Sequence, residues 1–166
     1  MPSTTDRIQK KVVLRAPRER VWSALTDSKQ FGTWFGVEFD GPFVAGQQLS
    51  GRIVPTQVDP EVAKAQEPHA GAKFDCWVEQ LEPMQRFSFR WHPYEIDPSA
   101  DPKKEPTTLV TFELNEVAGG IELTITESGF DQIPLERRAA AFASNDEGWT
   151  AQATLISKYL VREGAG

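Results

Sequence analysis

The sequence predicts an α+β fold in which an antiparallel sheet packs against a long C-terminal helix. Segments that alternate apolar and polar residues, the pattern of half-buried strands, are concentrated in the middle of the chain. Several links between them are short, such as Gly119-Gly120, and short links favour antiparallel pairing. Helical periodicity is confined to the two ends of the chain, and strands grouped between helices are typical of α+β proteins. If the long helix lies across such a sheet, the apolar face of the sheet is buried.

The size and charge of the chain limit the classes of protein to which it can belong. With 166 residues, 39 % hydrophobic and 25 % charged, it fits one soluble domain over residues 1–166. The net charge of −6 disfavours nucleic-acid binding, which needs clustered cations. A single Cys excludes an intrachain disulfide and an all-Cys metal site. No apolar run is long enough to span a membrane, and the polar N-terminus is unlike a signal peptide, so we expect no membrane partner and a cytoplasmic location.

A strand and a short helix are expected at the beginning of the chain. After a polar start at 1–7, residues 8–14 alternate loosely and predict a strand packed on one face. Pro17 suits the first position of a helix over about 17–26, because its missing N–H would have no helical partner there.

A second short helix is expected directly afterwards. Asp27 with Gln30 resembles a capping box, which predicts a helix of one or two turns that ends near Gly32. The adjacent aromatic residues of Trp34-Phe35-Gly36 fit a rim or corner better than a regular helix.

Five further strands are predicted over residues 46–54, 73–81, 86–92, 107–114 and 121–127. Gly51 is a weak point of the strand at 46–54. In the strand at 73–81, Leu81 and Cys76 have opposite parity and are expected on opposite faces. Two proline-rich loops lie at 55–72 and 93–106. The first is longer than most connections within a domain and is either a mobile lid or a bulky surface loop with some local helix.

The end of the chain is helical. Helical sequence begins at Pro134 and runs to about Ala143, where Ser144 with Glu147 fits a capping box and indicates a kink or restart. From 145 to about 162 an apolar stripe predicts a long helix with one buried face.

Several motifs, in their order along the chain, resemble those of a bacterial protein family. They are Ala16-Pro17 through Thr26-Asp27, Trp34-Phe35-Gly36, Arg86-Phe87-Ser88-Phe89-Arg90-Trp91, Ser128-Gly129-Phe130, and Glu147-Gly148-Trp149 with Leu155 and Tyr159-Leu160. The resemblance spans about residues 8–162. The family is the branch of the START-like (SRPBCC, birch-pollen-allergen-like) superfamily named after the activator of the heat-shock-protein-90 ATPase.

The resemblance implies a helix-grip fold, in which a curved antiparallel sheet wraps a long C-terminal helix and leaves a cavity between them. It also implies a single START-like domain with its core at about 8–162. Members of the superfamily commonly bind apolar small molecules, some cyclise polyketides, and the eukaryotic activator stimulates a chaperone. The long loops at 55–72 and 93–106 depart from the family pattern and would reshape the mouth of such a cavity.

The candidate ligand-binding residues are large apolar side chains expected to face the interior, together with one carboxylate. They are Trp34, Phe35, Phe87, Phe89, Trp91, Phe112, Leu123, Ile125, Glu127, Trp149 and Ile156. Two interpretations of the apolar set stay open. The side chains fill an ordinary core, as large apolar residues usually do, or they line a ligand cavity.

Glu127 is the ionisable residue that stands out. Its parity is that of Ile121, Leu123 and Ile125, so a carboxylate lies at the end of a buried face. Burial would raise its pKa and make it a candidate acid or base. The more ordinary interpretation is a strand-end carboxylate in water or paired with an arginine, for which Arg52 and Arg90 are candidates. By alternation, however, Arg90 is expected to point away from the side of Trp91, as a solvated residue of the sheet face.

The other reactive side chains have ordinary explanations. His69 and His92 are expected at the surface without further metal ligands nearby, and Cys76 is expected as a buried small hydrophobe. The sequence lacks the nucleophile-elbow, zinc-protease and phosphate-loop motifs. We therefore expect no metal and no cofactor.

Three functional hypotheses follow. The first is a cofactor-free module that binds a small apolar molecule between sheet and C-terminal helix. The second is a co-chaperone-like protein of the activator type, with a chaperone or a second copy of the chain as partner. The third is a cavity enzyme, cyclase-like or hydrolase-like, with Glu127 as acid or base; no catalytic motif in the sequence supports a reaction.

Overall fold

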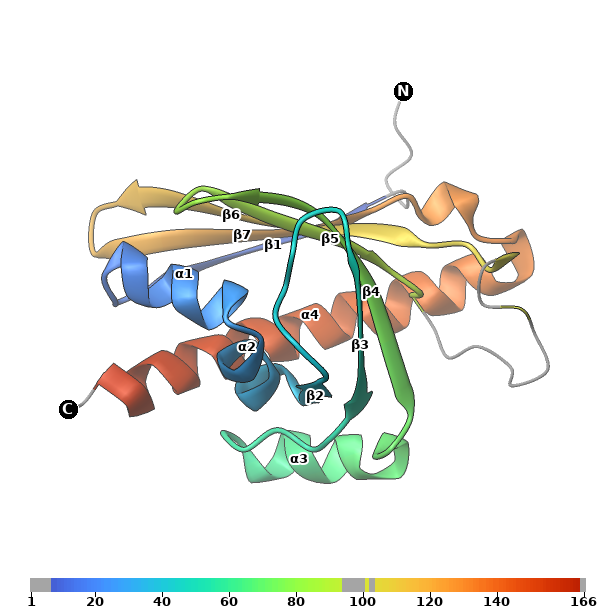
Figure 1. The fold of residues 1–166 in the computed structure, drawn as a ribbon, viewed down its shortest axis with the longest axis horizontal. Helices are drawn as coiled ribbons and strands as arrows, with labels where there is room; N and C mark the ends of the chain where they lie inside the picture. The colour runs from blue at the N-terminus through green and yellow to red at the C-terminus, as the bar shows by residue number, and fades with distance from the viewer. Residues whose placement is uncertain (1–6, 94–100, 102–103, 165–166) are drawn as a thin grey trace.

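The computed structural model describes residues 7–93, 101 and 104–164. In this part of the chain seven antiparallel strands form one sheet in the order β1-β7-β6-β5-β4-β3-β2 (Figure 1). The strands are β1 Arg7–Leu14, β2 Val37–Phe39, β3 Gln48–Ile53, β4 Lys73–Glu82, β5 Arg86–Trp91, β6 Thr108–Val117 and β7 Gly120–Ser128. The helices are α1 Arg18–Thr26, α2 Ser28–Phe35, α3 Pro60–Gln66 and α4 Leu135–Gly164, with 3₁₀ turns η1 Glu67–His69 and η3 Phe130–Gln132.

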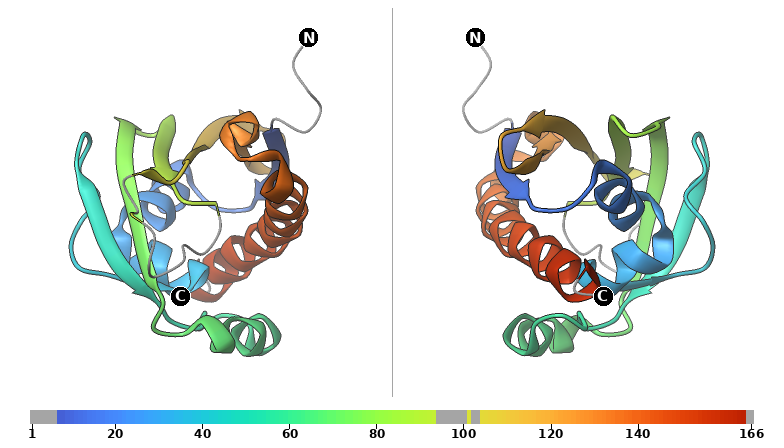
Figure 2. Two further views of the ribbon diagram at one scale, coloured as in Figure 1. Left: turned by 90° about the vertical axis from the view of Figure 1, so that its right-hand side faces the viewer. Right: turned by 90° about the vertical axis from the view of Figure 1, so that its left-hand side faces the viewer.

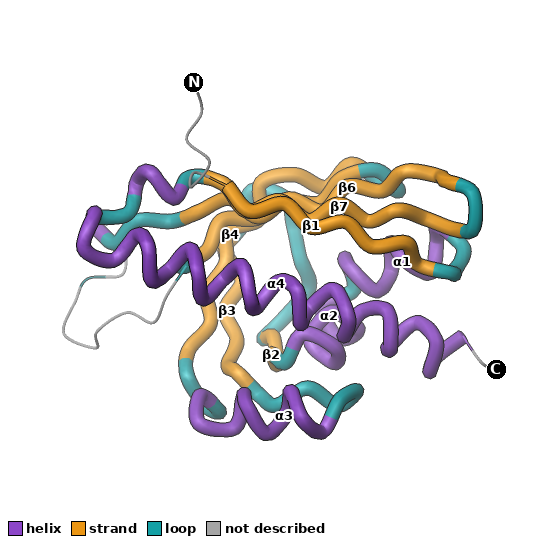
Figure 3. Tube along the Cα trace, turned by 180° about the vertical axis from the view of Figure 1, so that it is seen from behind, coloured by secondary structure: helices purple, strands orange, loops and turns teal. Residues whose placement is uncertain are grey.

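The sheet is curved, and the long helix lies along its concave side. Seen end-on, the strands form an arch, α4 closes one side of it, and α2 lies between α4 and the strands β3 and β4 (Figure 2). From behind, α4 crosses diagonally in front of the sheet, with α3 lying below β3 and β4 (Figure 3). The predicted α+β helix-grip architecture is confirmed. All six predicted strands are present, and the short strand β2 is an addition that the sequence did not indicate.

Helix α2 is longer than the sequence suggested. The Asp27 carboxylate caps its N-terminus by accepting hydrogen bonds from the N–H groups two and three residues on, at 2.9 and 3.3 Å. The helix then continues through Gly32 and includes both aromatic residues, so the expected corner at Trp34-Phe35-Gly36 is wrong. It ends at Gly36, whose φ of 100° is the left-handed conformation common after helices.

Gly32 is needed for close approach rather than for ending the helix. A Cβ on Gly32 would lie 2.0 Å from the carbonyl oxygen of Val37 in β2. Replacing Gly32 by Ala is therefore expected to destabilise the protein by about 1–3 kcal/mol, although Ala is the better helix former. Gly148 in α4 is the matched control, because nothing lies within 4 Å of its added Cβ. Gly148→Ala should stabilise by about 0.5–1 kcal/mol in urea unfolding. Equal effects of the two substitutions would contradict this assignment.

Helix α4 runs without interruption from Leu135 to Gly164, so the expected restart at Ser144 is wrong. Ser144 and Glu147 are both exposed, and the capping-box pattern therefore falls on the solvent side of a continuous helix.

The loop at 55–72 is a surface segment with local helix, one of the two interpretations left open. Asp59 caps α3, and its carboxylate also accepts a hydrogen bond from Lys158 of α4 at 2.6 Å. At the other end of α3, the Gln66 amide donates to the Phe35 carbonyl at 3.1 Å. These contacts join α3 to α4 and to α2. The loop at 93–106 lies for the most part outside the described residues.

The Asp59 contacts make the attachment of α3 sensitive to pH. The hydrogen bond from Lys158 is the main cause that lowers the Asp59 pKa below its ordinary value of 3.8, and backbone hydrogen bonds add to it. A lowered pKa contributes stability above the ordinary value, and this stability is lost as the pH falls through the lowered pKa. Asp59→Ala should therefore speed proteolysis within 60–66 at pH 7. The difference from wild type should vanish at acid pH, whereas a constant difference would contradict the role of the charge.

A bulge in β4 changes which face Leu81 occupies. The register with β5 shifts between Val78 and Gln80, so Leu81 pairs with Phe87 and packs against the core. The prediction that Leu81 and Cys76 face opposite sides of the sheet is therefore wrong, because the bulge inserts one residue and reverses the alternation of faces. Gly51, read as a weak point, lies inside β3, where a Cβ would be 2.4 Å from the Glu38 carbonyl oxygen of β2.

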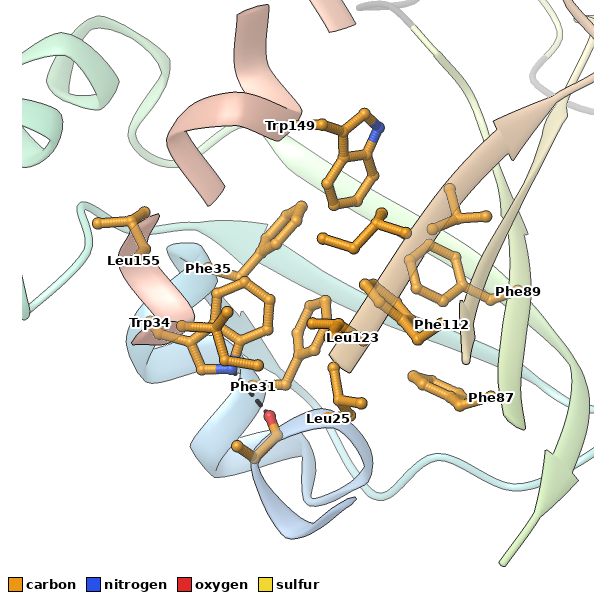
Figure 4. Packing of buried hydrophobic residues seen from close by; sticks show 14 of the residues in the cluster. Leu25, Phe31, Trp34, Phe35, Phe87, Phe89, Phe112, Leu123, Trp149 and Leu155 are labelled. Carbon is orange, nitrogen blue, oxygen red and sulfur yellow. Dashed lines mark hydrogen bonds between the residues drawn. The ribbon is translucent and has the colours of Figure 1, made fainter. Parts of the chain in front are cut away.

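The space beneath the arch is filled largely by aromatic rings (Figure 4). Phe31 of α2 is completely buried, and its ring centroid lies 4.8 Å from Trp34, 4.8 Å from Phe35 and 6.1 Å from Phe112. The Trp34 indole N–H donates to the carbonyl of Ala24 at 2.8 Å and so ties α2 to α1. The apolar positions expected to face inward do face inward.

Candidate ligand site at Glu127

Glu127 lies at the end of the sheet away from α1. The pairing of β5 with β6 sets Trp91 opposite Thr108, at the last and first residues of their strands. The pairing of β6 with β7 sets Glu127 opposite Val110, one residue before β7 ends. The other end of β7 pairs with Leu14, the residue after which the chain turns towards α1. The register therefore places Trp91, Thr108 and Glu127 close together at one end of the interior.

The Glu127 carboxylate is completely buried and accepts hydrogen bonds from four side chains. The indole N–H of Trp91 lies 2.8 Å from Oε2, and the Thr108 hydroxyl donates to the same oxygen. The indole N–H of Trp149 lies 2.8 Å from Oε1, and the Asn145 amide lies 3.1 Å from both oxygens. The carboxylate thus joins β5, β6 and β7 to α4.

The donors around Glu127 are all uncharged. Desolvation by burial raises the Glu127 pKa, and the four hydrogen bonds oppose this rise because they stabilise the charged form. The arginine pairing left open for Glu127 is wrong, whereas the outward direction expected for Arg90 is confirmed. Arg52 pairs with Glu38 at 2.6 Å, and Arg90 pairs with Glu79 at 2.6 Å on the outward face of the sheet. The interpretation of Glu127 as a solvated strand end is wrong as well, because its inward parity buries it.

Two tryptophans held by Glu127 form a wall of rings with two phenylalanines. Trp91 and Trp149 lie 5.5 Å apart between centroids, and Phe35 lies 6.0 and 5.9 Å from them. Phe74 of β4 lies 5.7 Å from Trp91 and 5.9 Å from Phe35. We call these four residues the aromatic wall. Trp91 is its only partly exposed member and stands at the end of its strand.

The remaining candidate residues are buried in the same interior. They are Trp34, Phe87, Phe89, Phe112, Leu123, Ile125 and Ile156. The rings that contact Trp34 are Phe31 and Phe35, and those that contact Phe87 belong to Phe43, Phe89 and Phe112. The structure thus brings Phe35, Trp91, Glu127 and Trp149 into one cluster and places Trp34 and Phe87 farther inside.

Sequence reasoning missed four residues of this site, although each had a usable signal. Thr108 shares the inward parity of Val110, and Phe74 shares the parity of Cys76 and Val78. Asn145 lies four residues before Trp149, and Gln152 lies three residues after it in the same helical stripe.

Gln152 is notable for a buried acceptor. Its Nε2 donates to the carbonyl oxygen of Phe35 at 3.2 Å. Its Oε1 is buried without a hydrogen-bond partner, and in the described part of the chain the only other such side-chain atom is Nε2 of His92. His92 is partly buried, with Nδ1 3.3 Å from the Pro106 carbonyl oxygen, so its expected surface position is wrong.

Two hollows on the surface are lined by other residues. One of about 760 Å³ lies at the outward face of the strand ends and includes Arg90, Leu109 and Ser128. The second, of about 320 Å³, lies between β1 and α4 and includes Lys10, Lys11 and Thr154. Neither contains a residue of the aromatic wall.

The described ranges were predicted to contain neither a metal site nor a reactive thiol, and their side chains can be compared with that expectation. They hold no cluster of three or more His, Cys, Asp or Glu side chains that could bind a metal ion. Burial raises the pKa of the Cys76 thiol to about 12, which keeps it protonated and unreactive at neutral pH. Cys76 is therefore the buried small hydrophobe that was predicted. Over the same ranges, no helix combines the length and the apolar character that crossing a bilayer requires.

A curved antiparallel sheet that grips a long C-terminal helix is the architecture of a START-like protein. The chain belongs to the family of Activator of Hsp90 ATPase homolog 1-like proteins, whose sequence model matches residues 15–161. This confirms the resemblance drawn from the sequence motifs. No curated protein matches the sequence.

Several solved structures share the fold. DynU16, from the dynemicin biosynthetic locus, is 24 % identical with a TM-score of 0.66, and the match covers 96 % of this chain and 48 % of that one. This chain therefore spans about half the length of DynU16. MLL2253 from Mesorhizobium loti is 21 % identical, with a TM-score of 0.68 and coverage of 94 % and 97 %. The Aha1 dimer from Colwellia psychrerythraea is 17 % identical, with a TM-score of 0.63 and coverage of 93 % and 94 %.

Proposed function

We propose that this protein binds a small apolar molecule between the sheet and α4, against the aromatic wall, and that it does so without a cofactor. The observation that carries the proposal is the complete burial of Glu127 among four donors from β5, β6 and α4. We propose a cytoplasmic location for this activity.

The Glu127 cluster is a costly way to build a core. Taking a carboxylate out of water is unfavourable even when it is hydrogen-bonded, and well-packed apolar side chains often serve stability as well or better. What the carboxylate does provide is orientation, because it fixes two indole rings through their N–H groups at 2.8 Å each. A rigid aromatic surface loses little entropy when an apolar ligand packs on it.

Binding would begin at Trp91. It is the least buried ring of the aromatic wall and lies at the end of β5, so it is the wall ring that a molecule arriving from solvent meets first. Asn145, also partly exposed, flanks the same end of the interior. The ligand would then lie against Phe35 and Trp149, with its apolar surface removed from water.

A thermal-shift screen of naphthalene-sized apolar compounds tests the proposal. A compound at 100 times its dissociation constant should add about 2.7 kcal/mol of stability. Trp91→Ala should reduce the shift, and Trp77→Ala is the matched control because Trp77 packs against His92, 5.3 Å away on the outward side. The proposal fails when no apolar compound shifts the wild-type transition.

A co-chaperone role is the second candidate, and it rests on the family of the chain and its likeness to the Aha1 dimer. Its partners would be a chaperone or a second copy of the chain. Capture of the purified cellular Hsp90 by the full chain supports it, and no capture together with a monomeric mass in solution argues against it.

Acid–base catalysis by Glu127 is the third candidate function. A carboxylate that already accepts from four donors has to give up one of them before it takes a proton from a substrate. Were turnover of any substrate found, unchanged rates in Glu127→Gln would dismiss this role.

A further inference from the structure

The ligand site described above contains one acceptor that is not used by the protein itself. The Gln152 side chain lies one helical turn after Trp149 and therefore on the same face of α4. Its amide contacts the backbone carbonyl of Phe35. The ring of Phe35 lies 5.9 Å from that of Trp149, and both residues are labelled in Figure 4. The amide thus contacts the backbone of one member of the aromatic wall.

The orientation of the amide follows from its neighbour. The Phe35 carbonyl oxygen only accepts hydrogen bonds, so the Nε2 of Gln152 must face it, at 3.2 Å. This leaves Oε1 pointing elsewhere, and there it is buried without a partner. A buried acceptor without a donor is unfavourable, and a ligand that supplies the donor removes that cost.

Glu127 cannot serve the same purpose. Its two oxygens already accept from Trp91, Thr108, Asn145 and Trp149. A ligand hydroxyl that approached Glu127 would have to displace one of these donors. Gln152 Oε1 meets no such competition.

We propose that Gln152 selects ligands that carry a hydrogen-bond donor, such as a phenolic hydroxyl, on an otherwise apolar ring system. This inference rests on the proposed function and names the chemical class of its ligand. The ring system lies on the aromatic wall, and the hydroxyl donates to Gln152 Oε1.

Three probes of similar shape test the proposal by calorimetric titration of the full chain: naphthalene, 2-naphthol and 2-methoxynaphthalene. The methoxy compound is more apolar than 2-naphthol but donates no hydrogen bond. Transfer out of water alone therefore favours the methoxy compound. With Gln152 as the acceptor, 2-naphthol should bind about tenfold more tightly than 2-methoxynaphthalene.

Two variants separate the acceptor from the fold. Gln152→Met should abolish the preference for 2-naphthol. Gln66→Met is the matched control, because Gln66 also donates to the Phe35 carbonyl, at 3.1 Å, while its Oε1 already accepts from the Thr56 N–H. It should keep the preference.

The possible failures are distinguishable. Equal affinity of wild type for the three probes overturns the role of Gln152 and leaves the proposed function standing. A preference that persists in Gln152→Met overturns it too. Absence of binding by all three probes overturns both the inference and the proposed function. The wild-type comparison decides the question even when Gln152→Met does not fold.

Discussion

Replacing Glu127 by Leu is expected to lower the free energy of unfolding by about 3–5 kcal/mol. The leucine side chain suits the apolar interior, but the substitution removes the acceptor of the Trp149 indole, the Thr108 hydroxyl and the Asn145 amide. The Trp91 indole keeps only the Thr108 hydroxyl oxygen, at 3.1 Å. Each buried donor left unsatisfied costs about 1–3 kcal/mol, and relaxation of the cluster keeps the total below their sum. The measurement is urea unfolding followed by circular dichroism.

The Gln variant and an outward-facing control sharpen this prediction. Glu127→Gln keeps one acceptor oxygen but turns an amide N–H₂ towards donors, so we expect a loss of about 2–3 kcal/mol. Glu122 lies on the same strand, with the opposite parity and partly exposed. Glu122→Gln should change stability by less than about 0.5 kcal/mol. Equal small effects at both positions would show that the Glu127 hydrogen bonds do not hold the fold together.

Replacing Trp34 by Ala is expected to lower the free energy of unfolding by about 3–5 kcal/mol, because it opens a cavity at a completely buried position. Trp34 is completely buried, packs 4.8 Å from Phe31 and 5.7 Å from Phe35, and donates to Ala24 at 2.8 Å. Trp34→Phe removes the donor and part of the ring, and should cost about 1–2 kcal/mol.

The control for this prediction is Trp77→Ala. Trp77 is partly exposed on the outward face of the sheet, and we expect it to cost about 1 kcal/mol in the same urea experiment. If Trp34→Ala and Trp77→Ala lowered the free energy of unfolding equally, the interior around α2 would be loosely packed, contrary to the ring distances.

Much of the fold followed from local pattern. The alternation in 86–92 and 121–127 correctly placed Trp91 and Glu127 on inward faces, and the periodicity after Trp149 correctly gave a helix. The errors came where tertiary contacts override local signals. Gly32 resembled a helix end but lies inside α2. Glycine is required there because a Cβ would clash with the Val37 carbonyl oxygen of β2.

The partners of Glu127 lay beyond local pattern. Which strand runs beside β7, and in which register, is decided by the whole sheet and not by either strand alone. The sequence therefore indicated a carboxylate at the end of a buried face, but not whether arginine or tryptophan would meet it. The bulge that turns Leu81 inward is a feature of the β4–β5 pair for the same reason.

The binding of an apolar molecule at the aromatic wall is tested most directly by the indole N–H signals of the five tryptophans. We expect titration of ¹⁵N-labelled protein with 2-naphthol to shift the indole signals of Trp91 and Trp149, which donate to Glu127. The signal of Trp77, on the outward face, should stay in place. Unchanged signals of Trp91 and Trp149 at saturating probe, or shifts confined to Trp77, would contradict the account.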